Sequence, residues 1–318
     1  MATGKLHPDA QRVCDLIIAA GRPPMETLSP REAREAYLAT RRILQPDPEE
    51  VAEVVALEAQ GPAGAIPLRL YRGKGVDKDR PQPALIYFHG GGWVIGDLES
   101  HDQVCRALAN AIPAIVVAVD YRLAPEHKFP AAVEDAIAAT GWIADNAQRL
   151  GIDAAKLAVG GDSAGGNLAT VVAIDARDRG GPALVCQVLI YPATDMRKDT
   201  ASHRLHAEQL PLRGALIDWF SAHYLSAERD KADWRASPVR ATSLKGLPPA
   251  LVITAGFDPL CDEGEAYARA LAAAGVPVEL ERFEGQIHGF LTMGRMVADS
   301  ARAIAASAAE CRRAFGKN

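Results

Sequence analysis

Residues 156–169 read KLAVGGDSAGGNLA, and this stretch decides the fold class. The apolar run KLAVG is typical of a buried strand, and residues 164–179 continue with a helical pattern. Between them, Gly161, Ser163 and Gly165 form a G-x-S-x-G motif. A strand that turns sharply into a helix holds this serine in a strained backbone, so its neighbours must lack bulk. We therefore predict that Ser163 projects a nucleophilic hydroxyl above a sheet; the alternative is a glycine-rich turn with a solvated serine.

The rest of the chain shows the same alternation of short apolar runs and helical patterns. Strand candidates lie at 51–59, 66–71, 84–88, 114–119, 184–190, 250–256 and 276–283. Helical patterns lie at 7–20, 30–44, 131–149, 263–274 and 298–314. This alternation predicts an α/β fold with a mainly parallel sheet covered on both faces. The run 66–71 alternates apolar and polar residues, which favours a place at the sheet edge.

Composition excludes several classes of function. The net charge of −5 and the absence of a long basic run argue against nucleic acid as a partner. The first residues lack the apolar run of a secretory signal, and no apolar stretch is long enough to cross a bilayer. Five scattered cysteines without a CxxC pair predict neither a disulfide framework nor a zinc site. We therefore expect a cytoplasmic protein without a membrane partner.

A nucleophilic serine needs a base, and the base needs an acid that orients it. Among the eight histidines, His288 follows the last strand candidate, so its loop should lie at the same sheet edge as Ser163. Asp258 follows the strand candidate 250–256 and should reach that edge as well. Two rivals for the acid, Asp262 and Glu263, should fall in the first turn of the next helix. We prefer Asp258.

A second glycine cluster lies in YFHGGGWVIGD (87–97). Its spacing fits neither the G-x-G-x-x-G dinucleotide fingerprint nor the P-loop, so a phosphate cradle is excluded. The remaining explanation is that the glycines expose backbone N–H groups to a negative charge that develops during a reaction. We predict an oxyanion hole made by the N–H groups of Gly91, Gly92 and Ala164. Trp93 is placed at the entrance of the substrate pocket.

At this point the sequence resembles the hormone-sensitive-lipase-like (bacterial family IV) carboxylesterases of the α/β-hydrolase superfamily. The matching segments are HGGGWVIGDLESHD (89–102), VDYRLAPEHKFPAA (119–132), GGDSAGGNLA (160–169), DPLCDEG (258–264) and HGF (288–290). The resemblance implies an α/β-hydrolase fold with an eight-stranded sheet. It implies a core of residues 51–194 and 241–318, and a helical cap of residues 1–50 and 195–240. A long insertion without a cap function is the alternative for 195–240.

The resemblance assigns the nucleophile to Ser163, the acid to Asp258 and the base to His288. It also implies that His89 supports its loop, and that Asp162 and Glu126 act as polar supports or as purely structural residues. The expected reaction is hydrolysis of short- to medium-chain carboxylic esters through an acyl-enzyme, without cofactor or metal. An amidase or deacetylase on the same residues and a non-catalytic ligand-binding relative are the alternatives. Relatives often form dimers through an edge strand and the last helix, so a homodimer is possible, with a monomer as the alternative.

Overall fold

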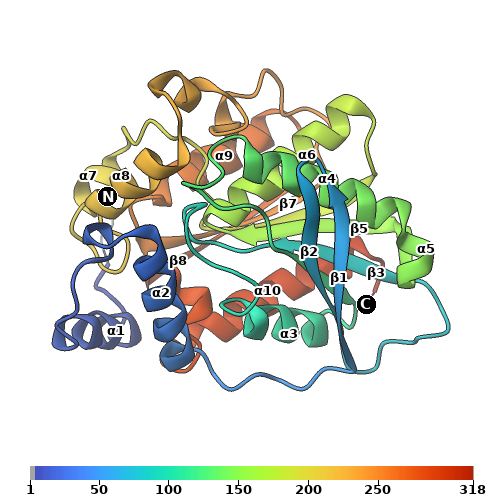
Figure 1. The fold of residues 1–318 in the computed structure, drawn as a ribbon, viewed down its shortest axis with the longest axis horizontal. Helices are drawn as coiled ribbons and strands as arrows, with labels where there is room; N and C mark the ends of the chain where they lie inside the picture. Colours follow the sequence, from blue (N-terminus) through green and yellow to red (C-terminus); the bar gives the residue numbers. More distant parts are fainter. Residues whose placement is uncertain (1–3, 318) are drawn as a thin grey trace.

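The computed structural model describes residues 4–317, and its centre is one eight-stranded sheet (Figure 1). The strands are β1 (Glu53–Gly61), β2 (Gly64–Arg72), β3 (Gln82–Phe88), β4 (Ile115–Val119), β5 (Ile152–Asp162), β6 (Leu184–Ile190), β7 (Ala250–Phe257) and β8 (Val278–Ile287). Their order is β1-β2-β4-β3-β5-β6-β7-β8. β2 runs antiparallel to both β1 and β4, and all neighbouring pairs from β4 to β8 are parallel. The predicted α/β fold class is therefore confirmed.

The central strands are buried on both faces because helices cover the sheet on both sides. All residues of β3 and β4 are buried, which explains why these strands read as continuous apolar runs. The expectation that 66–71 lies at the sheet edge is wrong, because β1 pairs along the whole length of β2 and takes that edge. The alternation in β2 arises because its two faces differ in burial.

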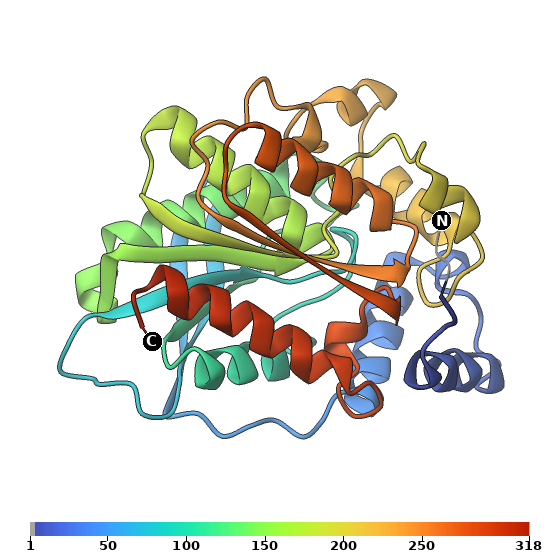
Figure 2. The same cartoon turned by 180° about the vertical axis from the view of Figure 1, so that it is seen from behind.

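Helices form one layer on each face of the sheet (Figure 2). α3 (Asp102–Ala111) and α10 (Asp299–Ala314) pack together on one face, while α4 (Ala131–Asp145), α6 (Ala164–Arg179) and α9 (Cys261–Ala273) cover the other. The short α5 (Ala147–Leu150) leads into β5. The sequence patterns missed α3, because its apolar end runs through a turn at Pro113 directly into β4 and conceals the boundary.

Two helices precede the sheet, namely α1 (Pro8–Ala19) and α2 (Pro30–Leu44), with the short η1 (Met25–Thr27) between them. α2 begins at a capping box in which Ser29 and Glu32 exchange hydrogen bonds, and Pro30 occupies the first turn. Arg34 fixes α2 to the core, since its guanidinium donates to the carbonyl oxygens of Val94 and Ala124 and pairs with Glu126 at 2.6 Å. The helix thus forms a fixed wall beside the glycine-rich segment.

The segment 195–240 contains α7 (Ala201–Leu205), α8 (Gly214–Tyr224), η2 (Glu228–Ala232) and η3 (Pro238–Arg240). Both views place α7 and α8 at the same end of the molecule as α1 and α2 (Figures 1 and 2). The last short helix before α10 is η4 (Phe290–Thr292). In the described part of the chain, no helix combines the length and apolar character that crossing a membrane requires.

Candidate active site

Ser163 lies in the turn between β5 and α6, in a backbone conformation that side chains rarely adopt. Its φ of 56° and ψ of −116° fall outside the helical and extended regions. The flanking glycines allow this turn because there is no room for a Cβ: one added at Gly165 would lie 1.9 Å from the carbonyl oxygen of Phe88, and one at Gly161 would lie 2.4 Å from the same atom. The G-x-S-x-G spacing therefore follows from close packing of the turn against the end of β3.

The structure brings Ser163, His288 and Asp258 together. Nε2 of His288 lies 3.0 Å from Oγ of Ser163, and Nδ1 lies 2.7 Å from Oδ2 of Asp258. The pairing of β7 with β8 explains this meeting, because Phe257 and Ile287 are the last register partners. Asp258 and His288 each follow directly after one of these two residues. Two neighbouring parallel strands thus place the carboxylate and the imidazole side by side at the carboxyl edge of the sheet.

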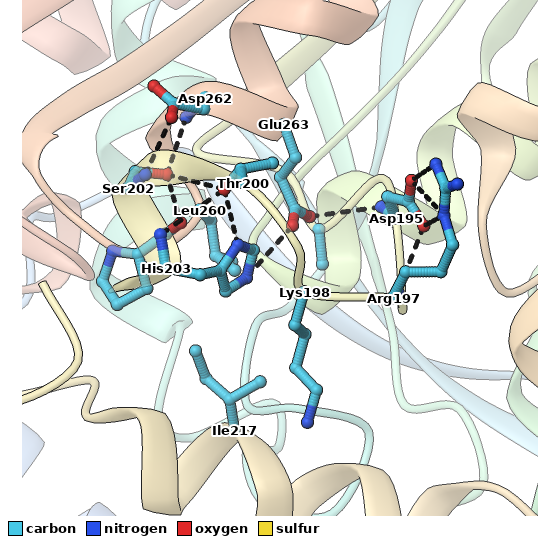
Figure 3. A network of polar contacts seen from close by, with 12 residues as sticks. Asp195, Arg197, Lys198, Thr200, Ser202, His203, Ile217, Leu260, Asp262 and Glu263 are labelled. Carbon is cyan, nitrogen blue, oxygen red and sulfur yellow. Dashed lines mark hydrogen bonds and ion pairs between the residues drawn. The ribbon is translucent and has the colours of Figure 1, made fainter. Parts of the chain in front are cut away.

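Asp258 is fully buried, and its second carboxylate oxygen, Oδ1, accepts a hydrogen bond from the N–H of Leu260 at 2.9 Å. The two rival acids lie in the first turn of α9 and point elsewhere. Asp262 accepts a hydrogen bond from the N–H of Ser202, and Glu263 accepts one from the N–H of Thr194 (Figure 3 shows both acids). Neither acid contacts His288, so only Asp258 has the geometry to orient the imidazole.

The glycine-rich segment after β3 presents free backbone donors beside Ser163. Within residues 4–317, no hydrogen bond uses the N–H groups of Gly91, Gly92 or Ala164. Gly91 and Gly92 have φ values of 128° and 57°. A Cβ at Gly91 would lie 2.1 Å from the oxygen of Ile95, and a Cβ at Gly92 would lie 2.3 Å from the ring of Phe220. The surrounding protein atoms therefore exclude side chains at both positions.

Trp93 is buried and lines the same cavity. Its indole ring stacks on Tyr224 of α8, with 4.3 Å between the centroids and 4° between the planes. The stack joins the glycine-rich segment to the 195–240 segment. Trp93 is therefore a packed wall residue, in contrast to the entrance position that the sequence suggested.

A buried polar cluster, missed as a unit at the sequence level, ties the two glycine-rich segments together. Oδ1 of Asp162 accepts hydrogen bonds from the hydroxyl of Tyr87 at 2.9 Å and the N–H of Gly90 at 3.0 Å, and Nε2 of His101 lies 3.2 Å from it. Burial alone would raise the pKa of Asp162, but the charge of His101 and the bond from Tyr87 outweigh burial and lower that pKa. Asp162 thus holds the segment before Gly91 against the turn that carries Ser163.

His89, which is also buried, supports the same segment. Its Nδ1 lies 2.8 Å from the carbonyl oxygen of Gly90, and its ring stacks on Tyr121 with 4.3 Å between centroids. Burial, followed by the charge of His101, lowers the pKa of His89 to about 4. The imidazole is therefore neutral at neutral pH, and its hydrogen-bond partners are Gly90 and Tyr121, which leaves His288 as the base beside the nucleophile.

Ser163 and His288 open into a cavity of about 630 Å³. Its walls come from α1, α2, the glycine-rich segment and the 195–225 region, and most of the lining side chains are apolar. Leu16, Ile18 and Ile43 line its outer part and are 42%, 67% and 50% exposed. A volume of this size suits a small organic ligand. The cavity therefore offers an apolar binding space, and the Ser163 hydroxyl is part of its lining.

One wall of this cavity carries a second polar network, centred on Glu263 (Figure 3). Oε1 of Glu263 accepts hydrogen bonds from the N–H groups of Thr194 at 2.6 Å and Asp195 at 3.2 Å, while Oε2 lies 3.3 Å from Nε2 of His203. Burial raises the pKa of Glu263 and lowers that of His203. The network braces the start of the 195–240 segment against α9. Within residues 4–317, no three or more His, Cys, Asp or Glu side chains gather in a group that could hold a metal ion.

Residues 85–292 match a family model described as the alpha/beta hydrolase fold. The chain is similar to the Carboxylic ester hydrolase LipN of Mycobacterium tuberculosis, with 47% identity over 262 residues that cover 80% of this chain and 69% of the relative. It is also similar to the Ethyl acetate hydrolase of Pseudomonas putida, with 37% identity over 93% of this chain and 95% of the relative. The range matched by the family model includes Ser163, Asp258 and His288.

Solved structures show the same likeness over nearly the whole chain. An alpha/beta hydrolase enzyme from the metagenome of Lake Arreo, Spain, superposes with a TM-score of 0.96 at 46% identity, covering 99% of this chain and 100% of that one. A hyperthermophilic esterase from the archaeon Pyrobaculum calidifontis superposes with a TM-score of 0.91 at 42% identity, covering 98% and 99%. The likeness therefore extends to the helices around the cavity as well as the sheet.

Proposed function

This chain belongs to the α/β-hydrolase family and is a carboxylic ester hydrolase, and we propose that Ser163, His288 and Asp258 are its catalytic residues. One observation carries the proposal above all others. A hydroxyl, an imidazole and a buried carboxylate form a continuous chain of contacts of 3.0 and 2.7 Å at the end of an apolar cavity. This order of groups allows a base to activate the hydroxyl and an acid to hold the base in the productive tautomer.

The first half of the proposed reaction forms an acyl-enzyme. Nε2 of His288 takes the proton of the Ser163 hydroxyl as Oγ attacks the ester carbonyl carbon. The carbonyl oxygen becomes negatively charged and accepts hydrogen bonds from the free N–H groups of Gly91, Gly92 and Ala164. Asp258 stabilises the imidazolium that forms. When the tetrahedral intermediate collapses, His288 gives its proton to the departing alcohol.

The second half releases the acid. A water molecule takes the place of the alcohol, and His288 removes its proton as the water attacks the acyl carbon. The same N–H groups stabilise the second oxyanion. Collapse of this intermediate breaks the bond to Oγ, and the proton returns from His288 to Ser163. The enzyme is thereby restored without an external oxidant, reductant or cofactor.

Turnover of p-nitrophenyl butyrate by the parent protein and by Ser163→Ala tests this proposal. We expect the variant to fold, with the circular dichroism of the parent, and to lose turnover by several orders of magnitude. Parallel assays of butyryl p-nitroanilide measure whether the amide bond is also cleaved. Turnover of the ester by Ser163→Ala at the parent rate would contradict the assignment of the nucleophile.

Three finer proposals rest on separate observations. α1, α2 and the 195–240 segment act as a cap over a core of residues 51–194 and 241–318, since both parts line the cavity together. The five cysteines are free and buried, which suits a reducing cytoplasm. A homodimer would use the outer edge of β8, whose Leu280 is exposed; light scattering of the purified protein distinguishes it from a monomer.

A further inference from the structure

The cavity wall formed by α2 contains a buried arginine that the reaction does not use. Arg41 lies in the last turn of α2, is only 6% exposed and lines the cavity together with Ser163 and His288. Its neighbour Arg42 points away from the cavity and is exposed. Two adjacent arginines on one helix therefore lie in opposite environments, and only the first faces the space that a substrate would fill.

The contacts of Arg41 leave its charge uncompensated. One terminal N–H group donates to Oγ1 of Thr292, and the guanidinium lies 4.9 Å from the centre of the Tyr37 ring. Nε is buried without an acceptor. No ion pair within residues 4–317 includes Arg41, so no carboxylate lies within 4.0 Å of it. A hydroxyl and an aromatic face stabilise a guanidinium, but neither neutralises it.

The other charged side chains around the cavity have partners, apart from the exposed Arg22. Lys198 pairs with Asp218, Arg213 pairs with Glu26, and Asp195 pairs with Arg197. Figure 3 shows the last of these pairs beside Glu263, which in turn faces His203. Asp162 faces His101. Among the residues that the structure describes, Arg41 is thus the one buried charged side chain of the cavity lining without an ion-pair partner.

Burying a cation without a counter-charge is costly, and a buried polar side chain normally has its hydrogen-bonding groups satisfied. An unpaired guanidinium in a substrate cavity therefore offers a binding site for an anionic group of the substrate. Its planar fork of N–H groups matches a carboxylate in particular. We propose that Arg41 is an anion subsite, and that the preferred substrates are esters that carry a carboxylate in addition to the scissile ester bond.

The surroundings of Arg41 place this subsite on the His288 side of the cavity. Thr292, which accepts its hydrogen bond, donates in turn to the carbonyl oxygen of Gly289 at 3.0 Å, and Gly289 follows His288 directly. A carboxylate held by Arg41 would therefore anchor the substrate on the wall next to the base, with its ester carbonyl at Ser163. Anchoring at a second point raises kcat/KM by fixing the orientation of the reacting group.

This inference rests on the proposed esterase function, and matched substrate pairs test it. On the acyl side, the p-nitrophenyl monoester of adipic acid is compared with the same ester of adipic acid monoamide. On the alcohol side, the acetate ester of glycolic acid is compared with that of glycolamide. Each pair exchanges a carboxylate for a neutral amide of similar shape. At neutral pH we expect the parent to favour the carboxylate of at least one pair by about tenfold or more in kcat/KM.

Arg41→Met removes the charge with little change of volume, and Arg42→Met is the matched control on the same helix. We expect the carboxylate-to-amide ratio to fall to about one or below in Arg41→Met and to stay at the parent value in Arg42→Met. A merely structural role of Arg41 would lower both rates together and leave the ratio unchanged. An unchanged ratio in Arg41→Met, or a parent that does not discriminate in either pair, would overturn the proposal.

A second measurement does not depend on the folding of Arg41→Met. Calorimetric titration of the Ser163→Ala protein with the same ester pairs measures binding of the intact substrates. Tighter binding of a carboxylate ester, lost when the pH falls below the pKa of the substrate carboxyl, supports the subsite; equal binding within both pairs contradicts it. Failure of the catalytic proposal itself would appear separately, as turnover of the neutral amide esters by Ser163→Ala.

Discussion

The N–H of Gly90 donates to Oδ1 of Asp162 at 3.0 Å, and this bond joins the segment of the proposed oxyanion hole to the turn that carries the nucleophile. Ser163 directly follows Asp162, and Gly91 directly follows Gly90. The distance between the Ser163 hydroxyl and the N–H of Gly91 therefore depends on this bond. The carboxylate is buried and lies 3.2 Å from Nε2 of His101, so it acts as a fixed link between the two segments.

Asp162→Asn keeps an oxygen for Gly90 but removes the negative charge that faces His101. Asp162→Ala removes both. We expect unfolding free energy to fall by about 3–5 kcal/mol in the alanine variant, because partners of a buried charge are left unpaired. We expect the asparagine variant to lose less stability and to retain more kcat. Thermal unfolding and kcat on p-nitrophenyl butyrate measure both effects. Equal kcat in the parent and Asp162→Ala would show that the link does not position the oxyanion hole.

Gly92→Ala should damage the oxyanion hole without removing any hydrogen-bonding group. Its Cβ would lie 2.3 Å from the ring of Phe220, and its φ of 57° disfavours a side chain. We expect displacement of the Gly91–Gly92 N–H groups and a fall in kcat of about a hundredfold, as when one oxyanion donor is lost.

Gly141→Ala is the matched control for this change. Gly141 lies inside α4, where an added Cβ meets no atom within 4 Å. We expect this variant to keep the kcat of the parent and to gain about 0.5–1 kcal/mol of stability from the higher helix propensity of alanine. Parent-like kcat in Gly92→Ala would mean that the N–H of Gly92 does not stabilise the transition state.

Asp120 should make the protein less stable as the pH rises. Burial, with the nearby negative charge of Asp97, raises the pKa of Asp120 from 3.8 to about 6. The folded state therefore holds the proton more tightly than the unfolded state. Its contribution to stability is fully present below pH 3.8 and is lost as the pH rises to about 6. Asp120→Asn removes this loss, so we expect a gain of about 2 kcal/mol at pH 7 that disappears near pH 4.

Glu126 provides the control of opposite sign. The hydrogen bond from Arg34 lowers the pKa of Glu126 to about 2, so its contribution is present above 4.5 and is lost as the pH falls through 2. Glu126 is half exposed, and we expect Glu126→Gln to lose less than about 1 kcal/mol at pH 7. Urea unfolding between pH 4 and pH 8 measures both variants. A stability difference between Asp120→Asn and the parent that does not change with pH would contradict the account of Asp120.

The apolar rim of the cavity predicts which acyl chains the enzyme accepts. Ile18 is 67% exposed and lines the outer part of the cavity, where only a chain of medium length would reach it. We expect kcat/KM of a p-nitrophenyl ester series to peak at short or medium chains. Ile18→Ser should lower the value for the octanoate relative to the acetate, because each buried methylene contributes about 0.8 kcal/mol. A maximum on long-chain emulsions, or no change in the ratio, would contradict this.

The fold could be predicted largely because each strand and helix has a local signature. The apolar runs at 84–88 and 184–190 are buried strands, and the capping box at Ser29 begins a helix where expected. The edge position of β2 was mispredicted for a physical reason. Alternation of apolar and polar residues indicates that one face of a strand is exposed. An edge position depends instead on whether the strand has a hydrogen-bonded neighbour on each side, and the strand's own sequence does not show this.

The candidate site also contains residues that the sequence could predict and residues that it could not. Ser163, Asp258 and His288 could be proposed because each lies directly after or within a strand-to-loop junction, and parallel strands bring such junctions to one edge. His101, Tyr87 and Arg41 could not, because their partners lie far away along the chain. The contact between Arg41 and Thr292 spans 251 positions, and no local pattern announces it.

The most direct test of the mechanism is covalent labelling with a fluorophosphonate, followed by mass spectrometry of the digested protein. Such a reagent reacts with a serine hydroxyl only when a base activates it. We predict one adduct per chain, on the peptide that contains Ser163, and its loss in both Ser163→Ala and His288→Ala. An unlabelled Ser163 in the active parent protein, or labelling that persists undiminished in His288→Ala, would contradict the assignment of nucleophile and base.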